Sequence, residues 1–68
     1  MPIISVTIAE GRTVERKRAL VRAITAAVTE SLGSRPEQVR VMISELPLDN
    51  YAVAGVTFAE AEANGEPA

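Results

Sequence analysis

The stretch from Thr13 to Gly33, TVERKRALVRAITAAVTESLG, decides the fold because it predicts one long helix in a chain of only 68 residues. Thr13 suits the N-cap position, Glu15 suits the positive end of the helix dipole, and Gly33 suits the left-handed residue that ends many helices. Apolar and small residues recur at spacings of three and four, which places them on one helix face. This stripe comprises Leu20, Val21, Ile24, Ala27, Val28, Ser31 and Leu32. We therefore predict a helix over 14–32.

A β-strand is predicted on each side of this helix, over residues 2–9 (PIISVTIA) and 39–45 (VRVMISE). Both stretches alternate β-branched apolar residues with polar or small ones, as strands with one apolar face do. The apolar positions are Ile4, Val6 and Ile8 in the first strand and Val39, Val41 and Ile43 in the second. Pro47 follows the second strand and ends it.

Strand, helix and strand together predict a β-α-β unit, whose two strands run parallel and whose crossover is right-handed. One helix covers only one face of such a sheet, so the other face, with Ile3, Met42 and Ala9, is left bare. Parallel sheets are normally covered on both faces. A chain of this length without a disulfide is also marginal as a monomer, because it buries only about 60% of its unfolded surface. We therefore expect an obligate oligomer.

The remaining segments predict small elements. Ser34 and Glu37 have capping-box spacing, which indicates a short helical turn. Residues 50–56 suit a small hairpin, and residues 57–68 suit a helical turn followed by a flexible tail. The expected fold is thus a single α+β domain over 1–68, a β-α-β unit with parallel strands and a short C-terminal hairpin.

Composition excludes several classes of function. The chain contains neither His nor Cys, and its net charge is −2, which gives no clustered basic surface for nucleic acid. We see no membrane-spanning run and no signal peptide, and we expect a cytoplasmic protein. There is no phosphate-binding glycine loop and no metal-ligand cluster, so we expect neither a cofactor nor a metal.

Pro2 is the first candidate for a catalytic base, because the two commonest catalytic side chains near neutral pH are absent. Removal of Met1 leaves a free prolyl amine on a rigid ring. An apolar pocket or a nearby cation lowers the pKa of such an amine into a useful range. By itself the Met-Pro start is a weak signal, since proline is also tolerated simply as the first residue of a strand.

Arg12 and Arg40 are candidates for binding an anionic substrate. Two guanidinium groups can hold a dianion through bidentate contacts. Taken alone, Arg40 is better explained by a salt bridge or a solvated strand edge, and Arg12 is compatible with a solvated loop. Parallel strands put Pro2 and Arg40 at one end, while Arg12 lies roughly 25 Å away beyond the other end. A site that uses all three must therefore be shared between subunits. Tyr51 suits either a wall of that site or a packing role, and we interpret Glu10 and Glu45 as structural.

In this order and spacing, the chain resembles the 4-oxalocrotonate tautomerase family over about residues 2–55. The resemblance rests on Pro2 after Met1, Glu10-Gly11-Arg12, the long helix, Val39-Arg40-Val41 and the segment from Tyr51 to Gly55. It implies a hexamer, commonly a trimer of dimers, and an enzyme of the kind used in aromatic hydrocarbon catabolism. It also implies a small dicarboxylate or enol substrate.

The resemblance further implies a role for each site residue. Pro2 acts as general acid/base and moves a proton from oxygen to carbon of a 2-hydroxydienoate such as 2-hydroxymuconate. Arg12 binds the far carboxylate, and Arg40 binds the 2-hydroxy or keto oxygen and the near carboxylate. Tyr51 stands where the family has a phenylalanine that keeps the site apolar, so the chain adds a hydroxyl there.

Two alternatives to this function remain. Hydration of a haloacrylate, as in the related dehalogenases, uses an extra arginine near the end of the first strand and a late carboxylate. This chain has Ala9 and Val53 in those regions, which disfavours that reaction. The second alternative is a non-catalytic subunit of a mixed hexamer, against which the joint presence of Pro2, Arg12 and Arg40 argues.

Overall fold

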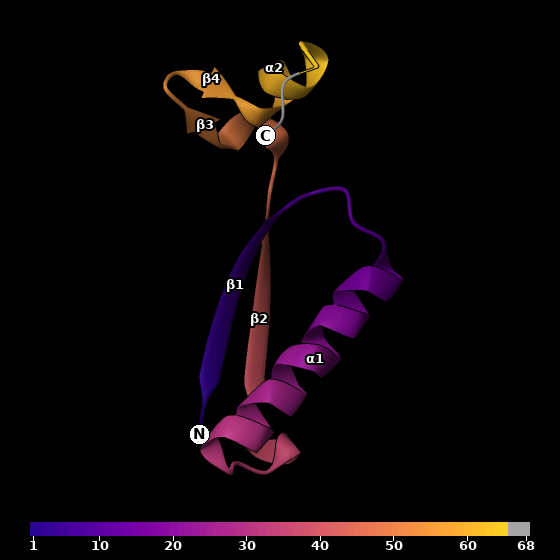
Figure 1. Ribbon diagram of the computed structural model, residues 1–68, viewed down its shortest axis with the longest axis vertical. Coiled ribbons are helices and arrows are strands. Elements are labelled where there is room, and N and C mark those ends of the chain that lie inside the picture. The colour runs from indigo at the N-terminus through magenta and orange to yellow at the C-terminus, as the bar shows by residue number, and fades with distance from the viewer. Residues whose placement is uncertain (66–68) are drawn as a thin grey trace.

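The computed structural model describes residues 1–65 and contains the predicted β-α-β unit. Strand β1 (Ile3–Ala9) leads through helix α1 (Val14–Leu32) to strand β2 (Arg40–Leu46). The two strands pair in parallel, from Ile3 opposite Arg40 to Ala9 opposite Leu46, and α1 lies along them (Figure 1). The expected α+β class and the parallel pairing are confirmed.

Helix α1 has the predicted bounds and both predicted caps. The Thr13 Oγ1 accepts a hydrogen bond from the backbone N–H of Arg16 at 3.2 Å. Gly33 has a φ of 71°, and its N–H donates to the Thr29 carbonyl at 3.0 Å. A side chain at Gly33 would be strained at that φ, which is why the helix ends there. Among residues 1–65, no helix is both long and apolar enough to cross a membrane.

The apolar stripe of α1 is only partly correct as predicted. Its residues up to Val28, apart from Ala27, are half-buried, whereas Ala27, Ser31 and Leu32 are exposed. The 19-residue helix is about 28 Å long, but each seven-residue strand spans only about 23 Å. The last helical turn therefore extends beyond the sheet, and Leu32 is left 68% exposed.

The turn before β2 begins one residue later than predicted. The expected capping pair, Ser34 with Glu37, is wrong: the Gln38 Oε1 instead accepts from the Arg35 N–H at 3.1 Å. Pro36 starts the 3₁₀ turn η1 (Pro36–Gln38), a position that its fixed φ favours. The Val39 N–H closes this turn on the Pro36 carbonyl at 3.1 Å, so β2 begins at Arg40 and ends at Leu46.

The C-terminal segment forms the predicted hairpin and a longer helix than expected. After η2 (Leu48–Asn50), strands β3 (Ala52–Val53) and β4 (Val56–Thr57) pair antiparallel, and α2 (Phe58–Ala63) follows. The hairpin turn has positive φ at Ala54 (52°) and Gly55 (82°), as a type I′ turn requires. Of the tail expected over 57–68, residues 57–63 instead belong to β4 and α2, and residues 66–68 lie outside the described residues.

The single chain has almost no core of its own. Among the described residues only Ala61 is buried, while Ile3 is 59% and Met42 is 55% exposed. The radius of gyration is 15.3 Å, against about 11 Å for a compact chain of this length. The hairpin and α2 sit beyond the end of the sheet, far from the N-terminus (Figure 1). The bare sheet face predicted at Ile3 and Met42 is thus present, although Ala9 is half-buried.

Candidate active site

Pro2 and Arg40 lie side by side at one end of the sheet, as the parallel pairing predicts. The Arg40 N–H donates to the Pro2 carbonyl at 2.9 Å, so the sheet ladder itself joins the two residues. The Arg40 Nη1 donates to the Glu37 carbonyl at 2.9 Å, which holds the guanidinium against η1. Pro2 is half-buried and Arg40 is exposed. We call this pair, Pro2 and Arg40, the amine end.

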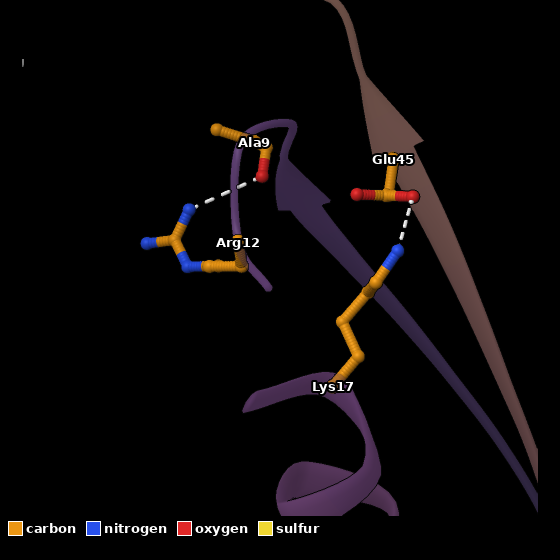
Figure 2. Close-up of polar contacts among 4 residues, drawn as sticks. All are labelled: Ala9, Arg12, Lys17 and Glu45. Carbon is orange, nitrogen blue, oxygen red and sulfur yellow. Dashed lines mark hydrogen bonds and ion pairs between the residues drawn. The ribbon is translucent and has the colours of Figure 1, made fainter. Parts of the chain in front are cut away.

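Arg12 lies beyond the opposite end of β1. Gly11 turns the chain there with a φ of 113°, a conformation that residues with a side chain rarely adopt. The Arg12 Nη1 donates to the Ala9 carbonyl at 3.1 Å, which folds the side chain back over the strand end (Figure 2). The seven residues of β1 separate Pro2 from this turn by about 23 Å.

The surroundings of Arg12 favour an anion. A cavity of about 270 Å³ lies beside it, with Arg12, Arg16 and Lys17 around a floor of Ile8 and Leu20. Lys17 is already paired, because its Nζ lies 2.9 Å from Glu45 Oε1 (Figure 2). Arg12 is exposed, and among residues 1–65 its guanidinium forms a hydrogen bond only with the Ala9 carbonyl.

Glu10 and Glu45 have structural partners, in agreement with their predicted role. Glu45 binds Lys17 and so ties β2 to α1. The Glu10 Oε2 accepts from the Leu48 N–H at 3.1 Å, and the Glu10 N–H donates to the Leu46 carbonyl at 2.9 Å. These two bonds fix the start of the Arg12 turn to the last residue of β2 and to the segment that follows it.

Tyr51 belongs to the same end of the molecule as Arg12. An apolar pocket of about 310 Å³ lies between the last residues of β1 and β2 and the rings of Tyr51 and Phe58. The two ring centroids are 4.5 Å apart with an interplanar angle of 65°, an edge-to-face contact. Tyr51 is 45% exposed and can contact a ligand. We call Arg12 and Tyr51 with this pocket the aromatic end.

Phe58 is the residue that sequence reasoning missed, since residues 57–68 were assigned to a turn and tail. The available signal was composition: Tyr51 and Phe58 are the only aromatic residues in the chain. The hairpin brings them together, because the Phe58 N–H donates to the Tyr51 carbonyl at 2.9 Å.

One chain therefore carries two groups of candidate site residues that its own fold keeps apart. The amine end comprises Pro2, whose nitrogen becomes a free amine only if Met1 is removed, and the cationic side chain of Arg40. The aromatic end comprises the cationic side chain of Arg12 and the apolar pocket beside Tyr51. The strand length between them is about 23 Å, much longer than a small dicarboxylate. The two ends can meet around one small molecule only if different copies supply them.

Comparison with known proteins gives a consistent result. The family profile described as "Tautomerase enzyme" matches residues 2–61. A 2-hydroxymuconate tautomerase from Bacillus subtilis is 45% identical over 62 residues, which cover 91% of this chain and 100% of that protein.

Two solved structures share the fold. A 4-oxalocrotonate tautomerase isozyme from Methylibium petroleiphilum is 51% identical with a TM-score of 0.88, over 93% of this chain and 98% of that one. A heterohexameric 4-oxalocrotonate tautomerase from Chloroflexus aurantiacus is 35% identical with a TM-score of 0.83, over 88% of this chain and 97% of that one. Profile, relatives and structures agree over nearly the whole chain, so this protein belongs to the tautomerase family and is an isomerase of that class.

Proposed function

We propose that the chain ketonises a 2-hydroxydienoate dicarboxylate such as 2-hydroxymuconate, with the amine of Pro2 as general acid/base after removal of Met1. The observation that carries this proposal is the pairing of Pro2 with Arg40 at one strand end. This backbone hydrogen bond supports the proposal, because it holds the proposed base, Pro2, and the residue that carries the guanidinium, Arg40, on neighbouring strand ends. Relatives named 2-hydroxymuconate tautomerase, from Bacillus subtilis and Comamonas testosteroni, support the substrate class.

The proton moves from oxygen to carbon within one substrate molecule. The Pro2 nitrogen takes the proton of the 2-hydroxyl group, the electrons shift along the conjugated chain, and the protonated amine returns the proton to a distant carbon. Arg40 binds the 2-oxygen and the near carboxylate, where negative charge develops, and stabilises it there. Arg12 binds the far carboxylate and draws electron density toward it.

Tyr51 contributes an apolar wall to this reaction. An apolar environment disfavours the charged form of an amine, so it keeps Pro2 available as a proton acceptor. It also strengthens the contacts of the two guanidinium groups with the substrate, because water no longer screens them. In the proposed complex each arginine binds one carboxylate of the substrate. The proposal therefore favours a substrate with two anionic groups over a monocarboxylate haloacrylate.

The assembly follows from the two separated ends. We infer a homohexamer, built as a trimer of dimers, in which the amine end of one copy meets the aromatic end of another. The exposed Ile3 and Met42 on the bare sheet face supply apolar contact surface for such an assembly. The Chloroflexus aurantiacus protein is a heterohexamer, but this chain carries Pro2, Arg12, Arg40 and Tyr51 together, so identical copies suffice.

An ultraviolet assay of untagged protein with 2-hydroxymuconate tests the proposal. We expect ketonisation by a protein whose intact mass lacks Met1. An alanine inserted between Met1 and Pro2 converts the proline nitrogen to an amide, which cannot accept the proton, and activity should be lost while the hexamer persists. Full activity of this insertion variant would exclude Pro2 as the base. Turnover of 3-chloroacrylate instead of 2-hydroxymuconate would favour the hydration alternative, and a pure chain that is inactive with both would favour the non-catalytic subunit.

A further inference from the structure

We propose that Phe58 is a positioning residue that fixes the ring of Tyr51 and thereby shapes the apolar wall of the active site. This inference rests on the proposed function for Tyr51. It assigns a task to helix α2, which lies outside the β-α-β unit and carries none of the proposed catalytic groups.

Phe58 holds Tyr51 at two points. Its backbone N–H donates to the Tyr51 carbonyl at 2.9 Å, which fixes the main chain of Tyr51. Its ring meets the Tyr51 ring edge to face, with centroids 4.5 Å apart. Aromatic pairs prefer this geometry to a stacked sandwich, because the positive edge of one ring faces the negative face of the other. The contact therefore selects one orientation of Tyr51.

Tyr51 needs such a partner because the short elements on either side of it do little to hold its side chain in place. It follows the single turn η2 and precedes the two-residue strand β3, and its side chain is 45% exposed. Among residues 1–65, no hydrogen bond of the Tyr51 hydroxyl is formed. Without the Phe58 ring, several Tyr51 rotamers would be open to solvent.

Phe58 is itself well anchored. It is the first residue of α2, and the Thr57 Oγ1 caps that helix by accepting from the Glu60 N–H at 3.1 Å. One turn further along, Ala61 is the single buried residue among those described. Phe58 is half-buried, unlike the exposed ring that it supports. Helix α2 is thus anchored by the buried Ala61, and its half-buried Phe58 in turn contacts the exposed ring of Tyr51.

The consequence for the site is that α2 sets the shape of the substrate pocket without touching the reacting atoms. Both rings line the same cavity of about 310 Å³, and we expect a change at Phe58 to alter the shape of that cavity through the position of Tyr51. An edge-to-face pair supports an effect of about two- to tenfold. We expect this effect in KM, because the wall binds substrate, while kcat stays within about twofold.

Spectroscopy tests the contact without any substrate. Tyr51 is the only tyrosine and the chain has no tryptophan, so the tyrosine band of the near-ultraviolet circular dichroism reports on this ring alone. Phe58→Leu keeps apolar bulk and should still fold, but it removes the aromatic edge, and the band should weaken. Glu62→Ala, at an exposed position on the same helix, is the matched control and should leave it unchanged. An unaltered band in Phe58→Leu would overturn the proposal.

A double-mutant cycle tests the consequence for substrate binding. Phe58→Leu should raise KM in the wild-type background but add almost nothing in a Tyr51→Ala background, because its effect passes through Tyr51. An equal increase in both backgrounds would mean that Phe58 acts by general stability or direct contact, and would refute the positioning role. Rescue of KM by Phe58→Tyr, which restores an aromatic edge, is also expected.

The two tests separate this inference from the proposed function. If the wild-type enzyme has no activity toward 2-hydroxydienoates, the proposed function fails, whereas the dichroism result still decides the Tyr51–Phe58 contact. If the enzyme is active and the cycle is additive, the positioning role fails and the proposed function stands.

Discussion

Arg12 and Arg40 have different proposed roles because they lie at opposite ends of the sheet. Arg40 shares a strand end with Pro2, so in the proposed mechanism it lies where proton transfer begins and where charge develops on the 2-oxygen. Arg40→Ala should therefore chiefly lower kcat, by about 10²-fold, as the loss of one preorganised charge-stabilising group does. Steady-state kinetics at several substrate concentrations measure this, and unchanged kcat/KM would exclude the assigned role.

Arg12 binds the far carboxylate in the proposed complex and also draws electrons toward it. Arg12→Ala should raise KM and lower kcat together, since the contact is made in both the ground state and the transition state. Arg18→Ala is the control, an exposed arginine of α1 outside the cavity beside Arg12. A kinetic profile of Arg12→Ala that matches this control would contradict the proposed contact.

At the level of elements, α1 is the part that the sequence predicts best, and its N-cap offers a measurable test. Thr13→Ala removes the acceptor for the Arg16 N–H and should cost about 1 kcal/mol of stability. Thr13→Ser keeps an acceptor in the same place and should recover most of the loss. Thermal unfolding at one fixed protein concentration measures both, because the melting temperature of an oligomer depends on concentration. Equal melting temperatures for Thr13→Ala and wild type would show that the cap contributes nothing.

The other elements show why sequence reasoning succeeds or fails. Period-two alternation places both strands to within one residue at each end, because local patterning of β-branched residues is enough to define them. The start of β2 is missed by one residue because Pro36 fixes where the preceding turn begins. The hairpin is predicted, but the Tyr51–Phe58 contact is missed because Phe58 follows the hairpin and falls in the predicted turn and tail. The contact forms only when the hairpin closes and brings the first residue of α2 back to Tyr51.

For the whole molecule, the sequence predicts that a single chain buries too little surface to be stable alone. The accessible surface area of the structure agrees with this prediction. The accessible surface is 5060 Å², against about 4,100 Å² for a compact protein of this mass. The arrangement of the copies in the assembly cannot be predicted from local sequence patterns, because it depends on contacts between the surfaces of different chains. The separation of the amine end from the aromatic end along β1 is nevertheless predictable, since it requires only strand length and parallel direction.

A charge on the bare sheet face tests the need for assembly. Met42 is 55% exposed in the single chain, and Met42→Lys would place an unpaired charge in the proposed apolar interface. For Met42→Lys we expect smaller species by sedimentation and at least a tenfold loss of activity. Met42→Leu conserves side-chain volume and should retain both the assembly and the activity of the wild type. A fully active monomer of Met42→Lys would refute the requirement for several copies.

The central claim is that Pro2 and Arg12 of one working site come from different copies of the chain, and subunit mixing tests it most directly. One inactive parent carries the alanine insertion before Pro2, and the other carries Arg12→Ala. When the two are unfolded together and refolded at equal amounts, about a quarter of the sites should combine an intact amine with an intact Arg12, if copies assemble at random. We predict that activity rises toward that fraction of wild type, well above either parent refolded alone. Activity that stays at the level of the parents would contradict the shared site.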